Sequence, residues 1–134
     1  MAQKKSVYKV DLHDTIAPLC DVPTPIIRHA VVEADGVAEA ALVEGVLEQN
    51  IKKLNDAMQF HTVSSFVHKF KPYGISHVVV LEESHIAIHT WPERGYIHLD
   101  VVTCTKDDMD LEKLEQVTRT IFAPTNLRIL KLDY

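Results

Sequence analysis

Apolar and polar residues alternate with two different periods along this chain, and each period predicts one kind of element. From Val37 to Met58 the apolar residues recur at steps of three and four, which is typical of an amphipathic helix that covers one face of a sheet. A second helix is predicted for Asp107 to Phe122, where several aspartates near its N-terminal end suit the helix dipole.

Between and around these helices the pattern changes to that of strands joined by tight turns. Strands are predicted at Val7 to Leu12, Thr62 to Phe70, His77 to Leu81, His85 to Trp91, Tyr96 to Cys104 and Leu127 to Leu132, with turns at Pro72 to Gly74 and Pro92 to Gly95. The remainder of the first 36 residues is expected to form a loop, punctuated by Pro18, Pro23 and Pro25. The order of elements predicts an α+β two-layer sandwich, an antiparallel sheet with helices packed on one face, in a single domain over residues 1–134.

Composition narrows the class of function. A net charge of -5 argues against a protein that coats nucleic acid or binds membranes through a polybasic surface, and favours a small-molecule site. No apolar run has the length of a membrane span, and the first residues lack the apolar core of a secretion signal, so we expect a cytoplasmic protein. Cys20 and Cys104 are too few for a disulfide framework.

Polar residues gather on one face of two consecutive predicted strands. Because side chains alternate across a strand, His85, His89 and Trp91 share one face, and Tyr96, His98, Asp100 and Cys104 share one face of the next strand. The turn between the strands brings the two polar faces together. Parity alone leaves two readings open, a functional site or the solvated free face of a two-layer fold.

Three segments within this region carry a specific resemblance. Lys71 to Ser76, Glu83 to Glu93 and Asp100 to Cys104, with their Glu-Ser-His, His-Thr-Trp-Pro-Glu and Thr-Cys sequences, closely resemble the prokaryotic S-adenosylmethionine decarboxylases, pyruvoyl-dependent enzymes made as self-processing proenzymes. The resemblance implies that the chain cuts itself between Glu83 and Ser84 into residues 1–83 (β chain) and 84–134 (α chain).

The resemblance also implies a role for each site residue. Ser84 attacks the carbonyl of Glu83 and becomes the covalent pyruvoyl cofactor, Ser76 stabilises the oxyanion, and His89 removes the α-proton of the serine. The pyruvoyl ketone then forms a Schiff base with the substrate amine, and Cys104 donates the proton that replaces carbon dioxide. No metal is expected.

For the substrate, the resemblance implies S-adenosylmethionine, with Phe70 stacking on the purine, Glu93 binding the ribose hydroxyls and Trp91 lining the pocket. The product would supply aminopropyl groups for polyamine (spermidine) biosynthesis, and a homodimer of cleaved protomers is expected. Cys20 and the histidines 13, 29, 61 and 68 are read as having no part in the site.

The chain departs from the family pattern at some positions. The family commonly has glycine at His77, tyrosine at Arg94, small residues at Ile97 and His98 and glycine at Thr105, and the usual Gly-Lys/Arg-His opening is absent from the first residues. Bulkier groups at His77 or Arg94 could reshape the pocket, so an arginine or ornithine decarboxylase on the same self-processing fold is the alternative.

Two further classes stay open. In one, His85, His89 and His98 hold zinc in a hydrolase or synthase, which leaves the Glu-Ser and Thr-Cys pairs unexplained. In the other, the chain is an uncleaved binding protein. A serine hydrolase is disfavoured because no GxSxG motif surrounds Ser84.

Overall fold

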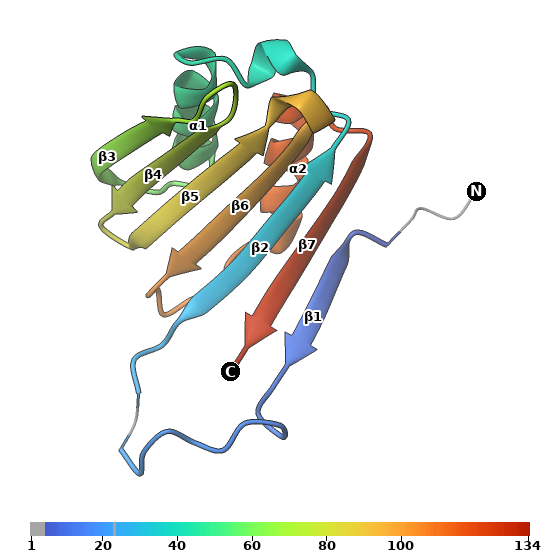
Figure 1. The fold of residues 1–134 in the computed structure, drawn as a ribbon. Helices are drawn as coiled ribbons and strands as arrows, with labels where there is room; N and C mark the ends of the chain where they lie inside the picture. The colour runs from blue at the N-terminus through green and yellow to red at the C-terminus, as the bar shows by residue number, and fades with distance from the viewer. Residues whose placement is uncertain (1–4, 23) are drawn as a thin grey trace.

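One mixed sheet organises the described part of the chain, which comprises residues 5–22 and 24–134 of a computed structural model. The strand order is β1-β7-β2-β6-β5-β4-β3 (Figure 1). The strands are β1 (Val7–Asp11), β2 (Arg28–Asp35), β3 (Thr62–Lys69), β4 (Ile75–Leu81), β5 (Ser84–Trp91), β6 (Tyr96–Thr103) and β7 (Asn126–Asp133). The helices are α1 (Val46–Ala57) and α2 (Leu111–Phe122), with short 3-10 turns η1 (Glu39–Ala41) and η2 (Pro92–Arg94).

Both helices lie on the same side of the sheet, as the predicted two-layer sandwich requires (Figure 1). The core forms where the apolar stripes of the helices meet the apolar parity of the strands, since burying these side chains is the main favourable term in folding. Its fully buried side chains include Leu47, Ile51 and Leu54 of α1, Leu114 and Phe122 of α2, and Val32, Ile86, Ile88, Ile97, Leu99 and Ile129 of the sheet.

The sheet is antiparallel except at one edge. Every pair of neighbours in the order β7-β2-β6-β5-β4-β3 runs antiparallel. In contrast, β1 pairs with β7 in parallel, with Val7 opposite Ile129. The expectation of a purely antiparallel sheet is therefore corrected at this edge. A parallel neighbour needs a long connection, and here the first and last strands of the chain are the parallel partners, so all the elements from β2 to α2 lie between them in the sequence.

The strand β2 was not predicted, although it lies near the middle of the sheet. Ala30, Val32 and Ala34 alternate at 0%, 0% and 3% exposure against the helices, which is the period-two signal of a strand. Pro18 lies in the expected loop, and Pro23 lies outside the described residues.

The predicted helices begin later than their apolar periodicity indicated. α1 starts at Val46 and not at Val37, because Gly45 at its N-terminus has φ +84°, which an α-helix does not contain. Val37 and Leu42 still pack into the core, at 4% and 1% exposure, but from a loop and the end of η1. α2 begins at Leu111, after Asp110 accepts a hydrogen bond from the Lys113 N–H.

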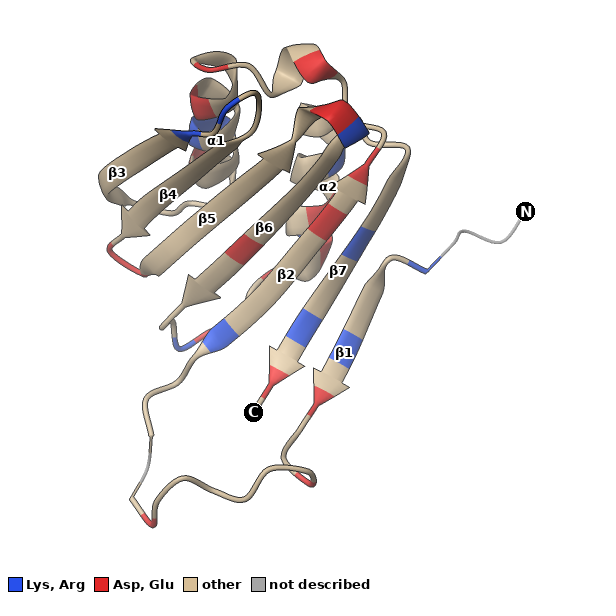
Figure 2. Cartoon of the chain, viewed as in Figure 1, with Lys and Arg blue, Asp and Glu red and all other residues tan. Residues whose placement is uncertain are grey.

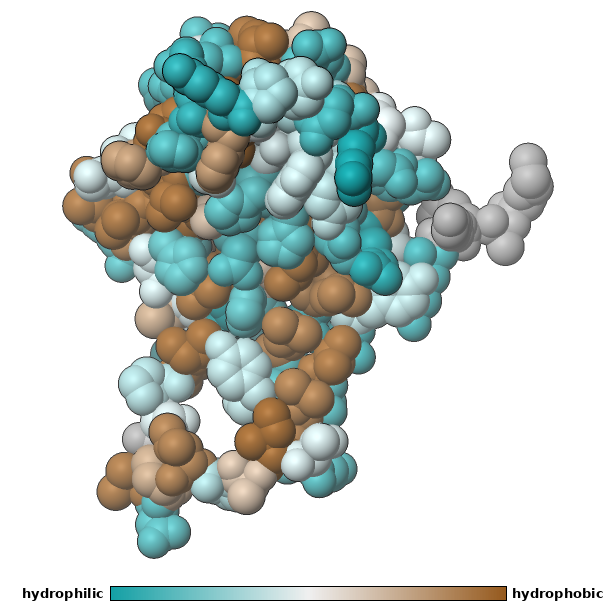
Figure 3. Space-filling model, viewed as in Figure 1, coloured by the Kyte–Doolittle hydropathy of each residue, from teal (hydrophilic) through white to brown (hydrophobic). Residues whose placement is uncertain are grey.

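The other face of the sheet carries no helix. Figure 2 shows that β4 and β5 have no lysine, arginine, aspartate or glutamate along their length. In Figure 3, polar side chains occupy the centre of this open face, with apolar side chains on both flanks. Phe66 and Val80, on β3 and β4, are 67% and 47% exposed there. Within the described residues, neither helix has the length and apolar content needed to cross a membrane.

The cap at Asp110 yields a stability prediction. Asp110→Ala removes the side chain that satisfies a free N–H at the start of α2, so the free energy of unfolding should fall by about 1 kcal/mol in a chemical denaturation experiment. Asp107→Ala, four residues before α2, is the control because its exposed side chain makes no hydrogen bond to any residue that the structure describes. Equal losses in both variants would show that the cap contributes nothing.

Candidate functional site

The Glu83-Ser84 peptide lies at the turn between β4 and β5, beside the end of β6. Ser84 pairs with Thr103, and this register brings the next residue, Cys104, against the peptide. The Cys104 N–H donates to the Glu83 carbonyl oxygen at 2.8 Å, and the Cys104 sulfur lies 3.3 Å from the Ser84 Oγ. The predicted nucleophile, scissile carbonyl and proton donor are therefore in contact.

The backbone at Ser84 is unusual. Its φ of +155° lies in a region that residues with a side chain rarely adopt. Such strain costs on the order of 1–3 kcal/mol and persists only where surrounding contacts enforce it, often at functional sites. Here the strain falls on the residue whose peptide bond is predicted to break.

Ser76 and His89 form a second pair, on the open face further along the sheet. They are directly opposed in the β4–β5 register, and the Ser76 Oγ lies 2.6 Å from His89 Nδ1. Burial lowers the pKa of His89 below its ordinary value of 6.5, the neighbouring His98 lowers it further, and Asp100 opposes the shift. The lowered pKa therefore favours the neutral imidazole, the form that can accept a proton.

Between the Ser84–Cys104 pair and the Ser76–His89 pair, the Asp100 carboxylate contacts two histidines. His29 Nε2 lies 2.7 Å from Asp100 Oδ1, and His85 Nε2 lies 3.5 Å from Asp100 Oδ2. His29 was read as having no part in the site, and its proximity depends on β2 pairing with β6, where Val31 opposes Asp100. Recognising β2 as a strand would have placed His29 on this face.

Aromatic side chains cluster at the opposite end of β5 from Ser84. The rings of Trp91 and Tyr96 lie 5.4 Å apart, and the Tyr96 hydroxyl donates to Glu33 at 2.6 Å. Burial and this carboxylate raise the pKa of Tyr96 to about 12, so the phenol stays protonated. The Glu33 carboxylate also pairs with Arg128.

Phe70 lines a shallow pocket of about 280 Å³ with Tyr73 and Pro92. Phe70 is 51% exposed, and Glu93 is exposed on η2, next to Pro92. The predicted substrate-binding residues Phe70, Glu93 and Trp91 therefore gather near one end of the sheet, in the same half as Ser76 and His89 but away from Ser84.

The two halves of the predicted site do not meet within one chain. Ser84 and His89 are five residues apart on one extended strand, which corresponds to about 17 Å at a rise of about 3.3 Å per residue. Ser84, Glu83 and Cys104 form one half, and the Ser76–His89 pair with the aromatic cluster forms the other. From the sequence, all of these residues were expected in one site, and their division into two separate groups was not predicted.

The expectation that His77 reshapes the substrate pocket is wrong. His77 lies on the helix-covered face, at 5% exposure, whereas its neighbour Ser76 faces the open side with His89. Burial lowers the pKa of His77, and its Nδ1 has no hydrogen-bond partner among the described residues. Ile97 is likewise buried in the core at 0% exposure.

The zinc alternative finds no support in the described residues. His85 faces Asp100 at 3.5 Å, and the rings of His89 and His98 are 6.2 Å apart. Across residues 5–22 and 24–134, the one group of three potential metal-binding side chains with ligand atoms within 4.8 Å is His61, Glu82 and Glu83, a different set.

Comparison with known proteins agrees with this geometry. A family model described as S-adenosylmethionine decarboxylase matches residues 28–133. An S-adenosylmethionine decarboxylase proenzyme of Archaeoglobus fulgidus is 35% identical over 107 residues, covering 79% of this chain and 95% of that protein. The proenzyme of a Sulfurihydrogenibium species is 42% identical over 82 residues, covering 60% of this chain and 55% of that protein, about half its length.

A solved structure shares the fold. The adenosylmethionine decarboxylase from Aquifex aeolicus superposes with a TM-score of 0.70 at 24% identity, over 84% of this chain and 94% of that one. The family match begins at Arg28, so β1 precedes the matched range. With the family model spanning residues 28–133 and the Archaeoglobus proenzyme covered almost entirely, this chain belongs to the S-adenosylmethionine decarboxylase family.

Proposed function

We propose that this chain is a self-processing S-adenosylmethionine decarboxylase, a pyruvoyl-dependent lyase whose cofactor is made from Ser84. The observation that carries the proposal is the Glu83-Ser84 peptide, where a strained serine is in contact with Cys104 and the preceding carbonyl already accepts an N–H. Membership of a family whose relatives are named proenzymes supports cleavage at this peptide.

The first chemical step is an N→O acyl shift. The Ser84 Oγ attacks the Glu83 carbonyl carbon, the C–N bond breaks, and the hydroxyl proton passes to the released nitrogen, which leaves an ester. The carbonyl oxygen becomes negatively charged on the way, and the Cys104 N–H at 2.8 Å is already placed to stabilise that charge. Ser76 is the expected oxyanion donor. Because it lies away from this turn within one chain, it would act as a second donor from the partner protomer.

The second step cuts the chain. Removal of the Ser84 α-proton expels the Glu83 carboxylate, and residues 1–83 separate from residues 84–134. The new terminal enamine tautomerises to an imine, and water replaces its nitrogen, releasing ammonia and leaving a ketone. His89 is the proposed base, because its lowered pKa keeps the imidazole unprotonated.

The separation of the two halves supports a homodimer in which each site is shared. A two-fold axis repeats every contact, so placing Ser84 of one protomer against the Ser76–His89 pair of its partner creates two equivalent sites. The open face suits burial against a second copy, because β4 and β5 are free of charged residues and Phe66 is 67% exposed.

The residues present fit a pyruvoyl group at position 84. When formed, that group supplies a ketone that captures the substrate amine and accepts the electrons released with carbon dioxide. The Cys104 thiol, 3.3 Å from the Ser84 side chain, is placed to deliver the proton that replaces the lost carboxyl group. Phe70 would stack on the purine and Glu93 would bind the ribose hydroxyls, with Trp91 alongside.

We also propose that the product serves spermidine synthesis as an aminopropyl donor and that the enzyme is cytoplasmic. Family membership supports both assignments. The acidic net charge of -5 supports the expectation that the protein binds neither nucleic acid nor a membrane surface.

Intact mass tests the proposal directly. Wild-type protein under denaturing conditions should give two chains, residues 1–83 and 84–134, with pyruvoyl at the start of the second, whereas Ser84→Ala should give one uncut chain. The cleaved protein should then release carbon dioxide from S-adenosylmethionine and not from arginine or ornithine. An uncut wild-type chain contradicts the enzyme class, and turnover of arginine or ornithine alone contradicts the substrate.

Mixed dimers test whether the site is shared. Ser84→Ala and His89→Ala should each remain uncut when expressed alone. When they are co-expressed with different tags, the His89→Ala chain should be cut, because its Ser84 meets the intact His89 of the partner, while the Ser84→Ala chain stays whole. If the His89→Ala chain remains uncut in isolated mixed dimers, the two residues do not act across protomers.

The pH dependence of cleavage tests the base. Because only neutral His89 accepts a proton and its pKa is lowered, the cleavage rate should fall as pH decreases, with its midpoint below 6.5. His98→Asn removes a neighbour that lowers this pKa, so the midpoint should move to higher pH. Rates from protein refolded across a pH series provide the measurement, and a midpoint above 6.5 in the wild type would exclude this assignment.

A further inference from the structure

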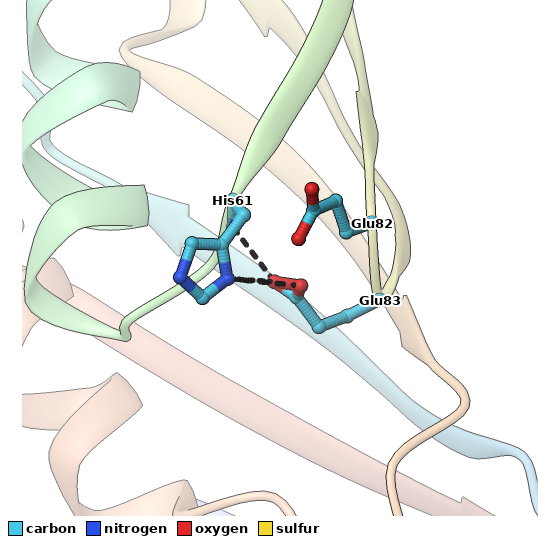
Figure 4. Close-up of side chains that lie close together, drawn as sticks. All are labelled: His61, Glu82 and Glu83. Carbon is cyan, nitrogen blue, oxygen red and sulfur yellow. Dashed lines mark hydrogen bonds and ion pairs between the residues drawn. The ribbon is translucent and has the colours of Figure 1, made fainter.

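His61 contacts the turn that carries the proposed cleavage site, and it has no role in the two proposed cleavage steps. His61 lies immediately before β3, and its contacts reach both glutamates of the β4–β5 turn (Figure 4). The Glu82 N–H donates to the His61 carbonyl at 2.8 Å. The His61 N–H donates to Glu83 Oε1 at 2.7 Å, and its ring Nδ1 lies 3.2 Å from each oxygen of the same carboxylate.

The side chains of His61 and Glu83 differ in their exposure to solvent. The His61 side chain is 67% exposed, but the Glu83 side chain is only 15% exposed. A mostly covered carboxylate needs hydrogen-bond donors, because leaving it without partners carries a desolvation cost. His61 supplies such donors to it.

Local backbone geometry presents His61 to the turn. The β3–β4 register shifts between Thr62 and Ser64, directly after His61. A β-bulge bends a strand and redirects the side chains beside it, and bulges are common next to active sites. The irregularity therefore occurs where the edge strand passes the scissile residue.

Together these contacts hold Glu83 from two sides. Its carboxylate is bound by His61, just before β3, and its carbonyl oxygen is bound by the Cys104 N–H, just after β6. With both ends of the residue fixed, the peptide plane between Glu83 and Ser84 cannot rotate freely, and the unfavourable φ falls on Ser84. Restricting the reacting carbonyl in this way lowers the entropy lost in reaching the transition state.

We propose that His61 is a positioning residue for self-cleavage, which holds the Glu83 carbonyl in front of the Ser84 hydroxyl through the Glu83 carboxylate. This inference rests on the proposed self-processing function. It gives His61 a role before cleavage only, because the bond that it helps to position no longer exists in the processed enzyme.

The experiment compares cleavage rates of freshly translated protein in a cell-free system, followed by the appearance of residues 84–134 on a denaturing gel. His61→Ala should cleave about tenfold more slowly than wild type, within the roughly hundredfold range that misplacement by about 1 Å can cost. His61→Asn should restore most of the rate, because its amide N–H can replace the ring Nδ1. His13→Ala is the matched control, since this exposed histidine contacts Asp11, far from the turn.

A second readout separates positioning from general stability. Once processed and normalised to pyruvoyl content, His61→Ala should show wild-type kcat and KM for S-adenosylmethionine. An unchanged cleavage rate in His61→Ala, or equal losses of cleavage rate, kcat and thermal stability, would overturn the proposal. Wild-type protein that never cleaves would instead remove the proposed function itself.

The side chains of His61, Glu82 and Glu83 could hold a metal ion, since their ligand atoms lie within 4.8 Å of one another. Wild-type cleavage is therefore also measured with EDTA and with added zinc. Rates that are the same in both conditions support positioning by hydrogen bonds. Cleavage that stops in EDTA and returns with zinc would replace this proposal with a metal site.

Discussion

The pairing of β5 with β6 is the constraint on which the rest of the site depends. Ile86 and Ile88 of β5 and Leu99 and Val101 of β6 are all at most 1% exposed beneath the helices, and their burial sets the parity of both strands. A shift of one residue would expose these side chains and turn the histidines into the core. The same register sets Ser84 opposite Thr103, which brings the Cys104 N–H onto the Glu83 carbonyl.

This arrangement gives the two faces of the sheet different tasks. The helix-covered face supplies the stability that holds a strained Ser84 backbone in place, while the open face displays Ser76, His89 and Asp100. Because Ser84 starts β5 and His89 lies near its far end, a single sheet separates the proposed nucleophile from the proposed base. Under the proposed function, association of two copies is part of the chemistry, because a second sheet would bring the two halves of the site together.

The features that follow from side-chain period were predicted well. The strands from β3 to β7, the helix α2 and the faces of His85 and His89 were evident in the sequence, because burial imposes period-two and period-3.6 patterns that a linear reading detects. The family was evident from the ordered Glu-Ser-His, His-Thr-Trp-Pro-Glu and Thr-Cys motifs. The failures have equally physical causes. β2 was missed among neighbouring loop signals, and α1 was extended backward because Val37 and Leu42 are buried without being helical.

Sequence alone determined which residues could carry the chemistry, because Glu83, Ser84 and Cys104 belong to a distinctive ordered motif and strand alternation follows from covalent geometry. Tertiary structure decided which of them meet. His29 reaches Asp100 through β2–β6 pairing, His77 points into the core and not into the pocket, and His61 reaches Glu83 across 22 residues of chain. Such contacts depend on strand order and register, which arise from packing between distant segments and have no local signature in the chain.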